Sequence, residues 1–269
     1  MQRMSWEQGV AAQAFFESGE ASTGLLLVKE AIRRGDGNGL LGITNPAMDA
    51  VDCGANGLPA YYAYLHTKDR RYWEALDRLA DWLEFSAPRA VSGQLYHNPG
   101  SSRAMIDGIY HIVPPLVAAG RTAFAMNQVS LFHQRHYDAR TGLYRQFWDD
   151  AANSFCRRGL WGGGQGWMAG ALALACLYLP PECRKDRESL AELLNRLLAA
   201  MKNYLRADGR FHDVLDDPST FPEVTASLMM CYAVYIGIRA AVVPLDEKTD
   251  ADRVLALLER YVDEEGFVN

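Results

Sequence analysis

Apolar residues recur at helical spacing along almost the whole chain. In residues 72–85 one face of the predicted helix is apolar and the other is charged; the apolar positions are Trp73, Leu76, Leu79, Ala80 and Leu83. Residues 190–205 repeat this spacing. No alternation of period two extends beyond three or four residues, so the pattern predicts about ten helices and a nearly all-α protein.

Polar residues mark where some of these helices begin. Ser5 followed by Gln8 predicts a capping box, and Asp250 predicts the start of the helix that carries an apolar stripe at 254–258. The apolar stretch 224–243 carries Arg239 and is flanked by Glu223. We therefore expect a buried helix there rather than a membrane span.

The loops between helices also repeat. A glycine followed shortly by a large apolar or aromatic residue recurs at intervals of 49 to 67 residues; these glycines are Gly39, Gly93, Gly142, Gly209 and Gly266. Two helices fit into each interval, which is typical of a repeat architecture of helical hairpins. Such units stack as an open solenoid or close into a toroid. One hairpin is too short to bury its own apolar face, so we predict a closed helical-hairpin toroid, as a single domain over residues 1–269.

Candidate catalytic and substrate-binding residues stand at the beginnings of the predicted helices. Acidic or aromatic residues stand there: Asp49 and Asp52, then Asp107, then Trp161 and Trp167, then Glu223. In a closed toroid these positions converge on one mouth. Paired carboxylates beside aromatic rings suit sugar chemistry, because one acid donates a proton while the other orients water and the rings pack on the sugar. The alternative for Asp52 and Asp107 is that each is a helix N-cap.

The run LWGGGQGWM at residues 160–168 is the most unusual segment. We expect its four glycines to form a loop that takes positive φ and approaches a ligand closely, just before a helix over 167–179. A phosphate-binding loop is a competing interpretation, but the run lacks the Lys and Ser/Thr of a P-loop. The remaining alternative is a turn with two core tryptophans.

Composition and charge exclude several classes. The 33 acidic and 27 basic side chains give a net charge of −6 with no Lys/Arg cluster, which argues against a nucleic-acid partner. The first ten residues lack the apolar run of a signal peptide. Five cysteines, an odd number without a CxxC pair, indicate a reduced, cytoplasmic protein and argue against structural zinc. We find no HExxH, Walker or GxGxxG motif, and predict no metal and no cofactor.

Six segments in order along nearly the whole chain resemble one enzyme family. They are SWEQGVAAQAFFE, VDCGANG, IDGIYHIVPPLVAAG, TGLYRQFWDD, WGGGQGW with a following LP, and FHDVLDDPSTFPEVTA. Together they resemble glycoside hydrolase families 88 and 105, the unsaturated glucuronyl and rhamnogalacturonyl hydrolases, in particular their fungal branch. The resemblance implies an (α/α)6 barrel of six helical hairpins, in agreement with the toroid.

The resemblance also implies a reaction. Members of these families act on the unsaturated uronyl residue that polysaccharide lyases leave, and they hydrate its vinyl ether. An aspartic acid protonates C4, water adds at C5, and the hemiketal opens and releases the sugar. The family's acid/base aspartate falls on Asp107, its partner on Asp52, and its two stacking tryptophans on Trp161 and Trp167. An acid that must be protonated near neutral pH needs a raised pKa.

The chain departs from the family pattern at the positions that surround the sugar. Met105 stands where members usually have Trp, His111 where Met is common, Gln146 where a histidine aligns, and Gln165 where Asn is usual. Gly163 replaces an arginine that in many members pairs with the uronate carboxylate. We retain Met105, His111, Gln146 and Gln165, with the two tryptophans, as predicted substrate-binding residues. The departures put the substrate in doubt more than the proton chemistry.

Two further groups have alternative interpretations. His111 lies four positions after Asp107, on the same helix face, and is either a second proton carrier or a packed histidine. The acidic run HDVLDDP at 212–218 is either a metal site or, as in the family, a structural loop. The sixth hairpin of a complete barrel needs two more helices after Gly266, so we expect missing residues or a homodimer that covers the open seam.

Three functions remain. The first is an unsaturated uronyl hydrolase with an altered sugar pocket, which takes a small saccharide. The second is the same scaffold recruited to a non-carbohydrate small molecule, as a hydratase or cyclase in a biosynthetic pathway. The third is a non-catalytic binding scaffold. We rank them in this order.

Overall fold

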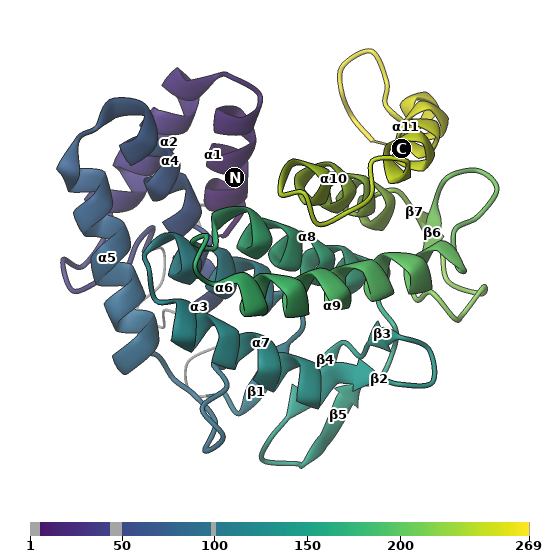
Figure 1. Ribbon diagram of the computed structural model, residues 1–269, viewed down its shortest axis with the longest axis horizontal. Helices are drawn as coiled ribbons and strands as arrows, with labels where there is room; N and C mark the ends of the chain where they lie inside the picture. Colours follow the sequence, from purple (N-terminus) through teal and green to yellow (C-terminus); the bar gives the residue numbers. More distant parts are fainter. Residues whose placement is uncertain (1–5, 44–49, 98–100, 269) are drawn as a thin grey trace. The chain divides into compact units, whose positions relative to one another are not determined.

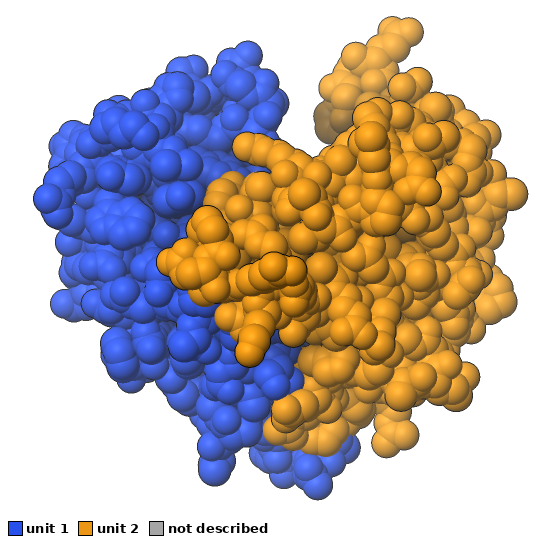
Figure 2. All heavy atoms as spheres, in the orientation of Figure 1, with its two compact units in different colours: residues 1–132, 149–154 blue, residues 133–148, 155–269 orange. Residues whose placement is uncertain are grey.

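The computed structural model describes residues 6–43, 50–97 and 101–268, and it divides into two compact units. Unit 1 comprises residues 1–132 and 149–154, and unit 2 comprises residues 133–148 and 155–269 (Figure 2). Eleven α-helices in the described part of the chain and only short strands of two to four residues confirm the prediction of a nearly all-α protein (Figure 1). No helix among these residues is long and apolar enough to cross a bilayer. Ser5, Asp49 and the predicted capping box lie outside, or partly outside, the described residues.

Unit 1 consists of paired helices around a buried one. α1 (Trp6–Glu17) packs on α2 (Ala21–Arg33), and α4 (Gly57–Thr67) packs on α5 (Arg70–Phe85). The short α3 (Ala50–Gly54) lies against α6 (Gly108–Ala118), which follows strand β1 (Arg103–Met105); α7 (Thr122–His136) begins in this unit. Residues 108–117 of α6 are all buried, so this helix is apolar all round and lies in the core.

The pattern at residues 72–85 is realised by α5. Leu76, Leu79 and Leu83 on its apolar stripe are fully buried. Complete burial of each leucine side chain stabilises the fold by about 1.5–3 kcal/mol. Asp69 begins the helix by accepting a hydrogen bond from the backbone N–H of Arg71 at 3.0 Å.

Unit 2 is built on α8. This helix (Gly162–Tyr178) packs against α9 (Arg184–Lys202) and α10 (Thr225–Arg239), and α10 packs against α11 (Glu247–Leu258), which continues into the 3₁₀ turn η1 (Glu259–Tyr261) (Figure 1). Two small antiparallel ladders lie between the helices. In one, β2 (Tyr137–Asp138) pairs with β3 (Leu143–Tyr144), and in the other β6 (Phe211–His212) pairs with β7 (Pro222–Glu223). The hairpin of β4 (Phe147–Asp149) and β5 (Ser154–Arg157) is divided between the units.

The repeated loop glycines share one backbone conformation. All five have positive φ, between 76° and 118°: Gly39, Gly93, Gly142, Gly209 and Gly266. Only glycine enters this region without steric cost, which explains why it recurs at these turns.

Two of these loops are held by a buried glutamine from a helix. In unit 1, Gln128 of α7 accepts a hydrogen bond from the backbone N–H of Leu95 at 3.0 Å and donates to the carbonyl of Gly93 at 2.9 Å. In unit 2, Gln165 of α8 makes the same pair of bonds with Tyr144. Each glutamine satisfies a backbone N–H and a backbone carbonyl on the loop edge that faces its helix.

The predicted start of the last helix is wrong. α11 begins at Glu247, three residues before Asp250. The carboxylate of Asp250 accepts a hydrogen bond from Lys202 Nζ at 3.0 Å, and Glu247 pairs with the same ammonium. Asp250 therefore joins α11 to α9 instead of capping a helix.

Candidate active site

Asp107 is a predicted catalytic acid whose surroundings favour its neutral form. It stands at the N-cap position of α6, but its side chain makes no capping hydrogen bond. The residue is half-buried, whereas its Oδ1 atom is fully shielded and has no hydrogen-bond partner. This burial raises the pKa of Asp107 above its ordinary value, and the charge of His97 and nearby backbone N–H groups oppose the shift. A raised pKa favours the protonated carboxyl, which is the form that a general acid needs.

Asp52 belongs to α3 and is held differently. Its Oδ1 accepts a hydrogen bond from the backbone N–H of Trp6 at 3.3 Å, and its backbone carbonyl accepts one from the side chain of Asn56 at 3.0 Å. The side chain is half-buried. The first turn of α1 thus fixes the orientation of this carboxyl.

Glycines bring the two helices that carry these acids into close contact. A Cβ atom at Gly54 would lie 2.3 Å from the carbonyl oxygen of His111, and one at Gly108 would lie 3.2 Å from Cγ2 of Val51. Residues 51–54 of α3 therefore lie along residues 108–111 of α6. Asp52 and Asp107 stand at these adjoining first turns; that their carboxyl groups act together stays a prediction.

His111 lies on the face of α6 next to this contact. It is 3% exposed, and burial lowers its pKa to about 3, so the imidazole is neutral near pH 7. Its ring lies 6.2 Å from that of Trp6 and 5.5 Å from that of Tyr110. These observations favour the packed histidine over the second proton carrier.

Trp6 is a residue of this site that the sequence analysis did not single out. Its indole is 37% exposed and tilts against His111, while its backbone holds Asp52. The motif SWEQGV contains it, and a tryptophan three residues before a glycine in that motif was the available signal. Met105, at the end of β1, is half-buried two residues before Asp107.

The glycine-rich run of unit 2 is helical, which corrects the predicted loop. Gly162, Gly163, Gly164 and Gly166 lie within α8, and none of them has positive φ. The reason for glycine is close packing: a Cβ at Gly166 would lie 2.6 Å from Cβ of Met229 on α10. The turn signal of glycine was overridden by the contact between two helices.

The tryptophans that flank this run lie close to one face of α8. A Cβ at Gly163 would lie 2.7 Å from Cζ2 of Trp161, so the indole of Trp161 folds back over this glycine. Trp167 stands one helical turn after Gly163, on the same face. Both tryptophans are half-buried.

Gln165 does not fit its predicted substrate-binding role. The side chain is fully buried, and both its polar atoms bind backbone groups. Its Oε1 accepts from the N–H of Tyr144 at 2.8 Å, and its Nε2 donates to the carbonyls of Tyr144 at 2.7 Å and Trp161 at 3.0 Å. Gln146 is half-buried, and its backbone N–H donates to the carbonyl of Gly159 at 3.2 Å.

Glu223 is a second carboxyl with a raised pKa. Burial raises the pKa, while hydrogen bonds from the backbone N–H groups of Thr225 and Ala226 oppose the shift. Through these bonds Glu223 caps α10, and a Cβ at Gly162 would lie 3.3 Å from its Oε1. The sequence placed Glu223 at a helix start, and the structure gives it a capping role there.

The acidic run at 212–218 forms a structured loop. His212 is bound on both sides, by the Thr220 carbonyl at 2.7 Å from Nδ1 and by Arg206 at 2.8 Å from Nε2. The carboxylate of Asp217 accepts from the hydroxyl of Ser219 at 2.6 Å. These contacts agree with a turn, and the described part of the chain contains no group of three or more His, Cys, Asp or Glu that would hold a metal ion.

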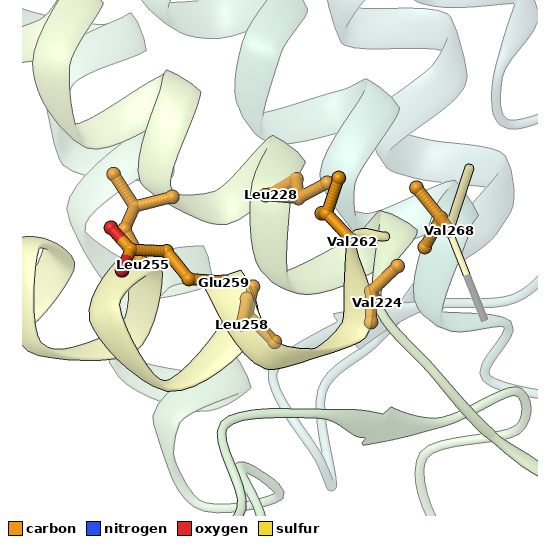
Figure 3. Close-up of a pocket in the computed structure, with 7 residues that line it drawn as sticks. All are labelled: Val224, Leu228, Leu255, Leu258, Glu259, Val262 and Val268. Atoms are coloured by element: carbon orange, nitrogen blue, oxygen red, sulfur yellow. The ribbon is translucent and has the colours of Figure 1, made fainter. Parts of the chain in front are cut away.

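A separate cavity lies at the C-terminal end of unit 2 (Figure 3). It has a volume of about 280 Å³ and a mostly apolar lining, which consists of Val224, Leu228, Leu255, Leu258, Glu259, Val262 and Val268. None of the predicted site residues lines it. The lining lacks the paired carboxylates that the proposed chemistry needs.

Comparison with known proteins decides the family. The model of Glycosyl Hydrolase Family 88 matches residues 1–269. The chain belongs to this family. The family 88 chain is 27% identical over 179 residues to the unsaturated rhamnogalacturonyl hydrolase YesR of Bacillus subtilis. That match covers 61% of the chain and 52% of YesR, so the chain spans about half the length of this curated relative.

Solved structures share the fold of this family 88 chain. A family 105 glycoside hydrolase from C. acetobutylicum has a TM-score of 0.83 at 19% identity, covering 99% of this chain and 81% of that one. An unsaturated glucuronyl hydrolase from Bacillus sp. GL1 has a TM-score of 0.71 at 16% identity, covering 98% and 76%. These likenesses confirm the predicted (α/α)6-type fold class of helical hairpins.

Proposed function

We propose that this family 88 chain is a glycoside hydrolase that removes an unsaturated glucuronyl or galacturonyl residue from a small saccharide by hydrating its vinyl ether. The observation that carries the proposal is the shielded, partnerless Oδ1 of Asp107, whose burial raises the pKa of this acid. Family membership supports it, and so does similarity to YesR, an unsaturated rhamnogalacturonyl hydrolase, and to the unsaturated glucuronyl hydrolase of Bacillus sp. GL1.

The proposed reaction assigns a role to each acid. Asp107 donates its proton to C4 of the C4–C5 double bond, and water adds at C5. The proton lost by the water returns to Asp107, and the resulting hemiketal opens and releases the sugar. Asp52, oriented by the N–H of Trp6, holds the water in position. We assign to Trp161 and Trp167, both half-buried, the sugar-stacking role that the family resemblance implies.

The test uses unsaturated glucuronyl and galacturonyl disaccharides, whose enol-ether absorbance in the ultraviolet is lost on hydration. Wild type should consume at least one of them, and Asp107→Asn should not. His66→Gln, a change at an exposed histidine of α4, is the control and should retain activity. A folded wild type that consumes neither sugar would exclude this substrate class and favour a recruited scaffold.

Stability distinguishes a catalytic loss from misfolding. Burial raises the pKa of Asp107 above its ordinary 3.8, so as the pH rises this carboxyl ionises in the unfolded chain before it ionises in the folded one. Between these two pKa values and above them, the carboxyl therefore lowers the free energy of unfolding. Asp107→Asn should therefore be inactive yet more stable than wild type at pH 7. The difference should vanish below pH 3.8, as followed by thermal unfolding at each pH. An Asp107→Asn variant that retains turnover would contradict the assignment.

We also propose a reducing, cytoplasmic location and a homodimer. All five cysteines are free thiols, and three of them are buried, which fits a reducing compartment. Analytical ultracentrifugation tests the dimer, and a monomer at micromolar concentration would contradict it.

A further inference from the structure

Another cavity of unit 2 is formed by the last residue of α9, the segment that follows it, and residues of α10 and α11. Its volume is about 220 Å³. Cations and apolar side chains share its lining, which consists of Lys202, Leu205, Arg206, Ala207, Met230, Asp250, Arg253 and Val254. Three of these residues are cations and one is an acid, although the whole chain has a net charge of −6. This local excess of positive charge favours an anionic ligand.

Two of the three cations are held in place by carboxylates. Nζ of Lys202 donates a hydrogen bond to Asp250 at 3.0 Å and also pairs with Glu247. Arg206 donates to Asp208 through Nε and Nη2, each at 3.2 Å. An ammonium has three N–H groups, so Lys202 retains one donor beyond its two carboxylate partners.

A histidine completes the hold on Arg206. Nδ1 of His212 lies 2.7 Å from the carbonyl oxygen of Thr220, which only accepts, so Nδ1 carries the proton. Nε2 of His212 then accepts a hydrogen bond from Nη1 of Arg206 at 2.8 Å. A histidine that accepts in this way is neutral, so it orients the guanidinium without cancelling its charge.

The carboxylates around the cavity do not neutralise its cations completely. Asp208 accepts from Arg210 at 3.0 Å as well as from Arg206, and Asp250 is likewise shared between two cations. Among the described residues, this network joins three carboxylates to four cations; the members are Asp208, Glu247, Asp250, Lys202, Arg206, Arg210 and Arg253. One positive charge therefore remains in excess.

Arg253 is the cation of the lining that its ion pair constrains least. Its Nη2 lies 3.6 Å from Oδ1 of Asp250, which is longer than an ordinary hydrogen bond, and its side chain is 63% exposed. A guanidinium offers two parallel N–H groups that match both oxygens of a carboxylate. Arg253 is thus suited to bind the head group of an anion in this cavity.

We propose that this cavity binds a small organic carboxylate. The carboxylate pairs with Arg253 and with the remaining N–H of Lys202, while the body of the molecule packs on the apolar part of the lining, Leu205, Met230 and Val254. The volume lies below the range of about 300–1,000 Å³ that drug-sized ligands occupy, so it suits an acid with a single ring or a short chain. The site is independent of the function proposed above, because none of the predicted catalytic or substrate-binding residues lines it.

Isothermal titration calorimetry at constant ionic strength tests the ligand class. The probes are benzoate, hexanoate and glucuronate, with benzamide as the neutral counterpart of benzoate and inorganic phosphate as an anion without an apolar body. At least one of the three acids should bind with a stoichiometry of one and a Kd of about 1 mM or lower. Benzamide and phosphate should bind at least tenfold more weakly. If none of the acids binds, or if phosphate binds as tightly as they do, the proposal is wrong.

Three variants locate the bound acid. Arg253→Gln should raise its Kd about tenfold or more, because a charge-assisted hydrogen bond is lost. Ala207→Phe places a large side chain in the cavity from an exposed position and should abolish binding. Arg196→Gln, an exposed arginine of α9 outside the lining, is the control and should leave the Kd unchanged. Equal weakening in Arg253→Gln and Arg196→Gln, or binding that survives Ala207→Phe, would overturn the proposal.

Thermal unfolding and turnover separate this inference from misfolding and from the proposed function. A saturating acid should raise the Tm of wild type but not that of Ala207→Phe, because a ligand of the folded state stabilises it. Without ligand, Arg253→Gln and wild type should unfold at similar temperatures and should act alike on an unsaturated disaccharide. If wild type consumes no unsaturated uronide and the acid still binds, the substrate assignment fails and this site stands; the reverse result removes the site alone.

Discussion

The glutamine that holds Tyr144 gives the sharpest test of how the site is built. Gln165→Leu keeps the side-chain volume roughly constant but removes the bonds to the N–H and the carbonyl of Tyr144, a residue that is 1% exposed. Each buried backbone group left without a partner costs about 1–3 kcal/mol. The greater apolar character of leucine offsets a part, so we expect the free energy of unfolding to fall by about 2–5 kcal/mol.

Urea denaturation followed by far-ultraviolet circular dichroism measures this loss. With a slope of about 2–3 kcal/mol per molar urea, the midpoint should fall by about 1–2 M. Gln128→Leu, which removes an equivalent pair of bonds from Gly93 and Leu95, should behave alike. Asn127→Leu, at an exposed position of α7, is the control and should change the stability by less than about 0.5 kcal/mol.

The opposite pattern would refute the reasoning. Suppose that Gln165→Leu retained the stability of wild type and lost activity through a raised KM. Gln165 would then contact substrate, and its bonds to the backbone of Tyr144 would contribute little to the free energy of unfolding. A loss of stability with a KM close to that of wild type on the remaining folded protein supports the structural role.

Two further predictions concern unit 1. Gly54→Ala should destabilise the protein by about 1–3 kcal/mol in thermal unfolding, although alanine favours helices, because its Cβ meets the carbonyl of His111; a stabilised variant would contradict the packing of α3 on α6. Hydrogen bonds from Ser102 and Arg103 lower the pKa of Asp149 to about 2, so this carboxylate contributes stability above pH 3.8 that is lost as the pH falls through 2. Asp149→Asn should therefore be less stable than wild type at pH 5, and the two should converge near pH 2; parallel curves would exclude the ion pair.

The sequence predicted the features that local patterns encode. The apolar stripe of α5, the buried helix α10 and the placement of the five repeated glycines in loops all depend on spacing along the chain. The start of α8 was mispredicted because glycine is ordinarily a turn signal. Here it allows Met229 of α10 to approach, and that residue is 63 positions away from Gly166 in the sequence.

The candidate site was also predictable only where a local sequence motif marks its residues. Asp52 and Asp107 were identified from their motifs, and the structure joins their helices through Gly54 and Gly108. The role of Gln165 was not predictable. Its side chain binds the backbone of Tyr144, 21 residues away, and the backbone N–H and carbonyl at position 144 would be the same with another side chain there.

The two loop-holding glutamines have a consequence for how this scaffold diversifies. Gln128 and Gln165 hold their loops only through backbone amides and carbonyls, which every amino acid except proline supplies in full. The outward side chains of these loops therefore take no part in the anchoring. Substitutions of these outward side chains are therefore expected to leave the glutamine bonds intact, so that the surface of each loop can change without a matching change in the interior.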